Sequence, residues 1–385
     1  MSSPYRKLQR KILRNLARHL KELGIEKHVS VDSGKANSWA DKGAIRASYK
    51  HLRRDKLSAA AGFLASRYAD LERHFADGNE IVPAAIEPEI EVVLSGTEQA
   101  DLFRLACLTW SIPVSEGFGR RIRCLVWDRH ANKLMGLFAL GDPVFNLGVR
   151  DRYVEWAASD RRAKLVDVMD AYVLGSVMPY SRLLCGKLVA CLLRTREVRD
   201  AFREKYHASR GIISRKRKRP ELVMITTTSA LGRSSVYNRL RLGGTKYLKS
   251  VGYTSGFGHF HVPDELFADI RELLRRRAHP YAEGNRFGQG PNWKFRAIRA
   301  ALELSGVDRD LLRHGICREV FCAELASNAR EILRGEQTVP NYRGLLSVRR
   351  VSLLARERWV VRRAETCLDF RSWKKTNLRR LVSEV

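Results

Sequence analysis

Two alternating histidines, His259 and His261, form the pattern in this sequence that most resembles a metal site. On a β-strand this spacing places both imidazoles on one face. Metal-dependent single-strand nucleases use such a pair to hold Mg²⁺ or Mn²⁺ beside a nucleophilic tyrosine, for which Tyr237, Tyr253 and Tyr281 are candidates. The alternative is a pair of half-exposed strand histidines without a ligand role, and so short a pattern leaves both interpretations open.

A second segment concentrates hydrogen-bonding and basic side chains directly after a β-branched run that predicts a strand. A strand-to-helix junction of this kind binds phosphate well, because Gly232 permits close approach while hydroxyl and helix N–H groups point at the anion. The alternative is that Ser234 only caps the helix and that the arginines are solvated. The predicted nucleic-acid-binding residues of this junction are Arg233, Ser234, Ser235, Asn238 and Arg239.

Two further basic segments are candidates for phosphate contacts. A run of five cations lies between a predicted helix and a predicted strand, and such a run repels itself unless a polyanion neutralises it. The basic face of the first helix, which begins at Pro4, is the other candidate; for both segments a solvated surface is the alternative. The run predicted to bind nucleic acid consists of Arg215, Lys216, Arg217, Lys218 and Arg219.

Several carboxylates cluster around predicted strand ends. Paired carboxylates hold Mg²⁺ in enzymes that cleave phosphodiesters, where the metal stabilises the attacking and leaving oxygens. In a strongly basic chain, however, acids also pair with nearby arginines, and both interpretations are open. The carboxylates concerned are Asp142, Asp151, Glu155, Asp167 and Asp170.

The elements that must position these residues form three segments in chain order. Residues 1–83 predict a helical N-terminal module, residues 84–262 an α+β core, and residues 263–385 a helical, basic C-terminal region. An antiparallel hairpin followed by strands that alternate with helices predicts a mixed sheet. The predicted strands are 90–94, 122–128, 133–140, 170–177, 221–229 and 257–262, and the predicted helices include 98–110, 181–193, 234–240, 295–304 and 316–333.

Several long motifs, in order along residues 14–333, resemble the DruA family of the Druantia anti-phage defence system, which has relatives near mobile elements. This resemblance implies a role in bacterial defence beside partner proteins, including a large helicase, and it implies no particular catalytic mechanism. The motifs are WSIPVSEGFGRR at 110–121, GLFALGDPVFNL at 136–147, VMDAYVLG at 168–175, TTTSALGRSSVYNRL at 226–240 and GFGHFH at 256–261.

The core also resembles the sheet of GNAT-type acyltransferases, in which a hairpin, a strand, a helix and a further strand follow one another. In those enzymes the pyrophosphate of acyl-CoA needs free backbone N–H groups at the start of that helix. Here only Gly186 remains of the usual glycines, and Pro179 stands where an N–H donor would lie. We therefore expect a GNAT-like sheet that has lost the acyl-CoA cofactor.

The charge balance is unusual for a chain of 385 residues, because 71 Lys and Arg stand against 42 Asp and Glu, a formal net charge of +29. This surplus favours a polyanionic partner, and nucleic acid leads that class. The apolar stretches are too short to cross a bilayer and the N-terminus lacks a signal-type segment, so we expect a cytoplasmic protein without a membrane partner. The seven cysteines form no CxxC pair and are expected to be reduced.

The sequence thus predicts a nucleic-acid-binding component of a Druantia-like defence system, with DNA as the expected nucleic acid. A metal-dependent single-strand nuclease or transposase-like enzyme is one alternative, with Tyr237, His259 and His261 as candidate catalytic or metal-binding residues and Mg²⁺ or Mn²⁺ as the cofactor. An acyl-CoA-dependent acyltransferase is the second alternative. The sequence does not decide whether the chain is an enzyme.

Overall fold

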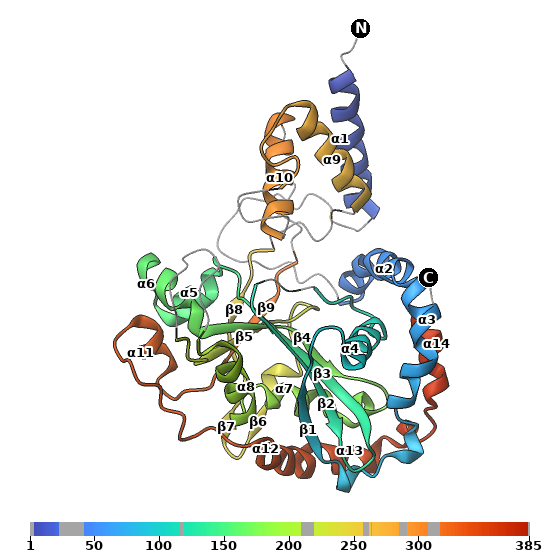
Figure 1. Cartoon of the computed structure of the whole chain (residues 1–385), viewed down its shortest axis with the longest axis vertical. Coiled ribbons are helices and arrows are strands. Elements are labelled where there is room, and N and C mark those ends of the chain that lie inside the picture. Colours follow the sequence, from blue (N-terminus) through green and yellow to red (C-terminus); the bar gives the residue numbers. More distant parts are fainter. Residues whose placement is uncertain are drawn as a thin grey trace. The chain divides into compact units, whose positions relative to one another are not determined.

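Two compact units make up the computed structural model of the chain (Figure 1). The first combines Met1–Leu52 with Thr254–Arg318, and the second combines Arg53–Tyr253 with Glu319–Val385. The chain therefore leaves the second unit after Tyr253 and returns to it at Glu319. The structure describes residues 4–22, 42–115, 117, 119–208, 219–256, 262, 264–284, 291–306 and 316–383.

The first unit is helical. Apolar residues at helical spacing on the predicted first helix bury one face, where Ile12 and Leu16 join Ile270, Leu273 and Trp293 in a single core. The opposite face of that helix is polar. The helices of this core are α1 (Pro4–Glu22), α9 (Asp264–Arg276) and α10 (Pro291–Leu304), and the boundary between the two units in the chain falls within α2 (Lys42–Ala59). The predicted helices from Pro4 and over 295–304 are confirmed.

A seven-stranded mixed sheet forms the centre of the second unit (Figure 1). All neighbouring strands are antiparallel except β4 and β5, which run parallel and are joined through helices. The hairpin predicted at 122–140 is confirmed as β2 and β3. In spatial order the strands are β1 (Pro88–Val92), β2 (Arg121–Asp128), β3 (Lys133–Gly141), β4 (Val168–Ser176), β5 (Met224–Thr228), β9 (Glu319–Glu324) and β8 (Lys249–Tyr253).

Helices cover both faces of this sheet, because successive strand residues point to opposite sides. On β2, Cys124 and Val126 enter the core beneath one set of helices, whereas Leu125 and Trp127 enter the core on the other face. The first face carries α7 (Cys185–Leu192), α8 (Arg196–Tyr206) and α12 (Val348–Ala355). The other face carries α3 (Ala61–Leu71), α4 (Glu98–Leu108), α14 (Leu378–Ser383), α5 (Gly148–Val154) and α11 (Ala329–Arg334).

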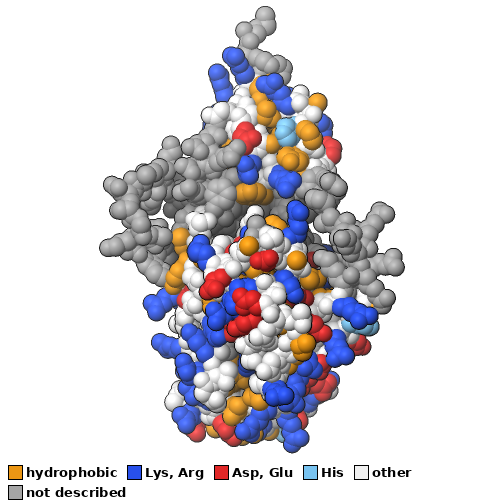
Figure 2. Space-filling model, turned by 90° about the vertical axis from the view of Figure 1, so that its left-hand side faces the viewer, with side chains coloured by type: hydrophobic (Ala, Val, Ile, Leu, Met, Phe, Trp, Pro, Cys, Tyr) orange, Lys and Arg blue, Asp and Glu red, His pale blue; other side chains and the backbone are white. Residues whose placement is uncertain are grey.

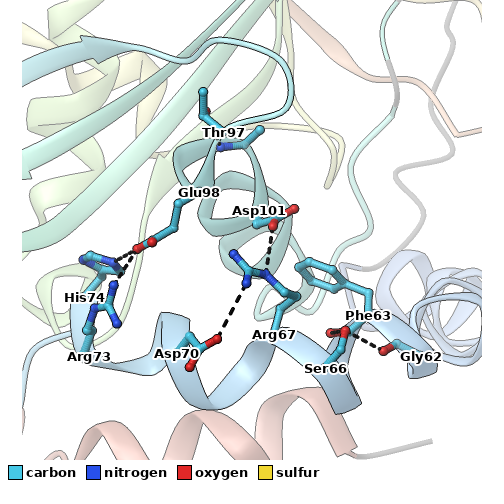
Figure 3. A network of polar contacts seen from close by, with 11 residues as sticks. Gly62, Phe63, Ser66, Arg67, Asp70, Arg73, His74, Thr97, Glu98 and Asp101 are labelled. Atoms are coloured by element: carbon cyan, nitrogen blue, oxygen red, sulfur yellow. Dashed lines mark hydrogen bonds and ion pairs between the residues drawn. The ribbon is translucent and has the colours of Figure 1, made fainter.

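Ion pairs hold α3 and the turn that follows it against α4 (Figure 3). Arg67 Nε lies 3.0 Å from Asp101, and both Arg73 and His74 contact the carboxylate of Glu98 at 2.9 and 2.7 Å. The hydrogen bond from His74 and the positive charge of Arg73 lower the pKa of Glu98. In this region the arginines therefore have acidic partners within the chain.

One predicted helix is wrong. Residues 316–333 form a central strand, β9, followed by the short helix α11. β9 is inserted between β5 and β8, so both faces of it are buried and its apolar residues form a run without the alternation that reveals a half-buried strand. Cys322 is fully buried there. Residues 257–261 of the predicted last strand lie outside the described residues.

The fold class, an α+β protein with a mixed sheet, is thereby confirmed. The three segments predicted in chain order, 1–83, 84–262 and 263–385, stay a prediction. None of the described helices is sufficiently long and apolar to span a membrane.

A buried carboxylate closes the end of the β2–β3 hairpin. Asp128 is fully buried and accepts hydrogen bonds from the Tyr180 hydroxyl at 2.9 Å, from Glu87 N at 3.0 Å and from His130 N at 3.2 Å. A buried carboxylate is stable only while such donors replace its hydration shell. The Tyr180 hydroxyl therefore stabilises the fold.

Replacing Tyr180 by Phe should lower the free energy of unfolding by about 1–3 kcal/mol, because the buried Asp128 loses one donor. Tyr247→Phe is the matched control, since the buried Tyr247 hydroxyl has no hydrogen-bond partner in the described structure and its removal should cost nothing. Urea unfolding of the two variants measures the difference. Equal stabilities would contradict this account of Asp128.

Candidate nucleic-acid interface

The junction predicted to bind phosphate lies at the end of β5. The chain leaves the strand at Ser229, whose N–H donates to Glu319 O at 2.9 Å, and Gly232 O accepts from Glu319 N at 3.1 Å. Gly232 has a φ of +71°, which favours glycine at this bend. The predicted helix 234–240 is shorter than expected and is a single 3₁₀ turn, η6 (Tyr237–Arg239).

Glu319 places a carboxylate at the start of this turn. Its side chain accepts hydrogen bonds from Ser234 N at 2.9 Å, from Asn238 Nδ2 at 2.9 Å and from the Ser250 hydroxyl at 2.7 Å. Glu319 is only 3% exposed, so these donors replace its water. The Ser234 N–H and the Asn238 amide of this junction therefore bind a carboxylate of the chain itself.

The polar residues of the junction thus divide into two groups. Ser234 caps the turn, because its hydroxyl accepts from Tyr237 N at 3.1 Å, and the Asn238 amide is committed to Glu319. Arg233, Ser235 and Arg239 are exposed. Across the described ranges neither arginine has an ion-pair partner, in contrast to the arginines of Figure 3.

Arg239 belongs to a cluster of three cations, together with Lys187 and Arg358. Burial, together with the like charges of Arg239 and Arg358, lowers the pKa of Lys187. Lys187 lies on α7, and its Nζ lies 5.3 Å from the ring centroid of Trp359. Arg358 belongs to the π-helical turn η8 (Arg356–Val360), which continues α12, and α12 packs on both α7 and β6 (Arg241–Leu242).

Sequence reasoning missed Lys187 and Arg358 as partners of Arg239. The only signal for Arg358 was its place in the basic tract 342–380, and Lys187 lies within an apolar helix pattern. Their proximity depends on the packing of α12 against α7. Such a contact cannot be predicted from a local sequence pattern.

The remaining nucleic-acid candidates are only partly described. Arg219 is exposed at the end of the basic run. Arg215, Lys216, Arg217 and Lys218 lie outside the described residues.

The described residues give little support to the nuclease interpretation. His259 and His261 lie outside them. The ring of Tyr237 packs edge-on against Phe321 at 5.4 Å, and burial raises the pKa of Tyr237 to about 12. A phenol that ionises less readily than usual is a weaker nucleophile at neutral pH. The parts of the chain that the structure describes contain no group of three or more metal-ligating side chains.

Three of the five clustered carboxylates have arginine partners. Asp142 pairs with Arg120 at 2.7 Å, and Asp151 pairs with the fully buried Arg150 at 2.6 Å. Glu155 lies 3.6 Å from Arg334. The pairing alternative to a magnesium site therefore accounts for these three acids.

Asp167 and Asp170 have neutral donors instead. Asp167 accepts from Glu221 N at 3.0 Å, and Asp170 accepts from the Thr226 hydroxyl at 2.7 Å. Burial raises the pKa of each carboxyl group to about 6, although these hydrogen bonds oppose the shift. Ionisation of either carboxyl group therefore destabilises the folded state.

The start of α7 does not fit an acyl-CoA pyrophosphate. Tyr180 and Leu183, in the turn before the helix, are fully buried, and the N–H of Lys187 donates to Leu184 O at 2.9 Å. The C-terminal region contacts the same turn, where Arg363 Nε donates to Arg182 O at 3.2 Å. The N–H groups and the space that a pyrophosphate requires are thus used within the chain.

The fold and the junction together define a class, an α+β protein with a seven-stranded mixed sheet and an arginine-flanked junction at one end of it. Residues 40–335 match the family described as "Druantia protein DruA". The Druantia protein DruA of Escherichia coli (strain UMEA 4076-1) is 48% identical over 374 residues, which cover 97% of this chain and 92% of that protein. This chain belongs to the DruA family, and the resemblance seen in its motifs is confirmed.

Membership in this family supports the expected role as a component of anti-phage defence. The aligned region includes most of residues 342–385, which lie beyond the family motifs found in the sequence. No solved structure matches the chain significantly.

The raised pKa of Asp170 predicts a pH-dependent difference between the protein and its Asp170→Asn variant. The pKa of this carboxyl group is about 4 in the unfolded chain and about 6 in the folded protein. Its contribution to stability is therefore fully present below about pH 4 and is lost as the pH rises through 6. Relative to the parent, Asp170→Asn should therefore gain up to about 2 kcal/mol between pH 4 and pH 7. Chemical denaturation at both pH values measures this change, and parallel pH profiles would refute it.

Proposed function

We propose that this chain is the nucleic-acid-binding component of a Druantia defence system and that DNA is its nucleic acid. The observation that carries the proposal is the state of the β5–η6 junction. The Ser234 N–H and the Asn238 amide donate to Glu319, whereas Arg233 and Arg239 are exposed and lack acidic partners within the described ranges. Guanidinium groups in this state are suited to the phosphates of a polyanion.

The electrostatics of the neighbouring cluster support the same conclusion. Lys187, Arg239 and Arg358 lie near enough to lower the pKa of Lys187, and this repulsion costs free energy in the free protein. A bound phosphate chain would relieve that repulsion and release its own counterions. The net charge of +29 acts in the same direction over longer distances.

The basic run 215–219 and the basic face of the first helix are proposed as further phosphate contacts. Phosphate contacts fix position and carry little sequence information, so we expect weak sequence preference at this surface. The system's helicase is the proposed protein partner, and the proposed compartment is the cytoplasm. The helicase is what the family resemblance implies, and the compartment is the one expected from the sequence.

A GNAT-like origin of the sheet is part of the proposal. The single parallel pair, β4 and β5, follows an antiparallel hairpin and is connected through α7, which is the order that this resemblance implies. The filled turn before α7 supports the loss of the acyl-CoA site. In this proposal the sheet serves as a scaffold for the basic surface.

Arg233→Ala and Arg239→Ala should each weaken DNA binding by about 5- to 150-fold, because a positioned guanidinium–phosphate contact is worth roughly 1–3 kcal/mol. Titrations by gel shift or anisotropy at about 50 mM salt measure this loss. Each variant should also reduce the slope of log K against log salt by about one. Lys216→Ala should cost less affinity and change mainly that slope.

Arg129→Ala is the charge-matched control. Arg129 is exposed but pairs with Glu89, so its removal changes the net charge equally while leaving the proposed interface intact, and affinity should change less than about twofold. Failure of the parent protein to bind any DNA or RNA at low salt would overturn the proposed function. Unchanged affinity in folded Arg233→Ala and Arg239→Ala would make the junction purely structural.

A further inference from the structure

An exposed apolar turn connects β3 to α5. The turn follows Asp142, and the side chains of Val144 and Phe145 are 47% and 45% exposed. The view in Figure 2, from the side where α5, α6 (Ala158–Lys164) and α11 lie in Figure 1, shows exposed hydrophobic side chains beside Lys and Arg in the sheet-bearing unit. Scattered exposed apolar residues are ordinary, so the turn needs a further feature before it suggests a site.

That feature is the buried guanidinium beneath it. Arg150 is fully buried, its Nη1 donates to Val144 O at 2.8 Å and its Nη2 donates to Phe145 O at 3.0 Å. Asp151 balances the charge of Arg150 at 2.6 Å. Burying a guanidinium is expensive, and here its donors serve to hold the backbone of a turn whose own side chains point into solvent. The backbone of the turn is therefore held rigidly while its Val144 and Phe145 side chains stay exposed.

A second arginine stacks on the presented ring. The guanidinium carbon of Arg161 lies 4.6 Å from the Phe145 ring centroid, and Arg161 Nη1 is held by Asp151 at 2.8 Å. The ring nonetheless stays 45% exposed. Phe145 and Arg161 thus form a fixed stack with one accessible aromatic surface.

The surroundings of the stack are basic. Arg152 on α5 and Arg162 on α6 are exposed, and neither has an ion-pair partner in the described part of the chain. Charge complementarity therefore favours a polyanionic occupant over another basic protein surface.

We propose that Phe145 stacks on an unpaired nucleobase of a single-stranded or locally opened DNA, while Arg152 and Arg162 contact the adjoining phosphates. Aromatic and arginine planes stack on any base and are used in this way by proteins that bind single strands. A base within a duplex has both faces covered and cannot make this contact. The inference rests on the proposed nucleic-acid binding and names the substrate class that it favours.

The test uses the full-length protein and a single-stranded oligonucleotide that carries 2-aminopurine, whose fluorescence falls when the base stacks on an aromatic ring. Phe145→Ala should abolish the quenching and weaken single-strand binding by about 5- to 150-fold, with an unchanged salt slope because no charge is removed. Affinity for blunt duplex DNA should stay the same. Phe145→Tyr should restore quenching and affinity, and Leu368→Ala, at an exposed apolar residue away from the turn, should have no effect.

Each outcome bears on a separate claim. Absence of binding to any nucleic acid by the parent protein defeats the proposed function, whereas parent binding that Phe145→Ala leaves unchanged defeats the stacking inference alone. Equal losses on single strands and duplexes also overturn it, as does loss of a co-purifying protein partner with single-strand binding intact. Phe145→Leu, which keeps an apolar side chain but no ring, should lose quenching as Phe145→Ala does and serves if that variant fails to fold.

Discussion

The carboxylate of Glu319 on β9 ties together two other segments of the sheet-bearing unit, the junction after β5 and strand β8. It accepts hydrogen bonds from the junction after β5 and from Ser250 on β8, while its own backbone pairs with the junction at Gly232. Glu319 is also the first residue to return after the chain's excursion into the helical unit. A charge buried to this extent holds its donors in place, because losing any one of them exposes an uncompensated anion.

That constraint explains why so little of the junction is available for a ligand. The Ser234 N–H and the Asn238 amide, which could have bound a phosphate, donate to Glu319 instead. Arg233 and Arg239 are exposed and form no ion pair in the described part of the chain. Elsewhere, too, acids have donors within the chain: Asp128 in the hairpin, Asp151 beneath the β3–α5 turn, and Glu98 between α3 and α4. Because Lys and Arg outnumber Asp and Glu by 71 to 42, cations remain in excess after such pairing.

Local patterns were enough to predict the hairpin, the first helix and the mixed sheet, because each shows an amphipathic period or a turn signal. β9 could not be recognised, since a strand buried on both faces carries an apolar run that a buried helix carries equally well. The junction could be recognised in the sequence, but its partner Glu319 lies more than 80 residues away along the chain. Lys187 and Arg358 are likewise far apart in the sequence. Such contacts are products of strand order and helix packing and leave no local trace.

The two surfaces proposed to meet DNA differ in what they can recognise. The junction and the Lys187 cluster offer charge alone, which suits the phosphates of any strand and weakens steeply with salt. The Phe145–Arg161 stack offers an aromatic face on which only an unstacked base can stack. The apolar part of that contact does not depend on the salt concentration. A protein that combines them retains duplex DNA weakly through charge and gains affinity wherever the strands separate. Held beside a helicase, such a protein would bind most tightly at the point where that helicase has already exposed single strands.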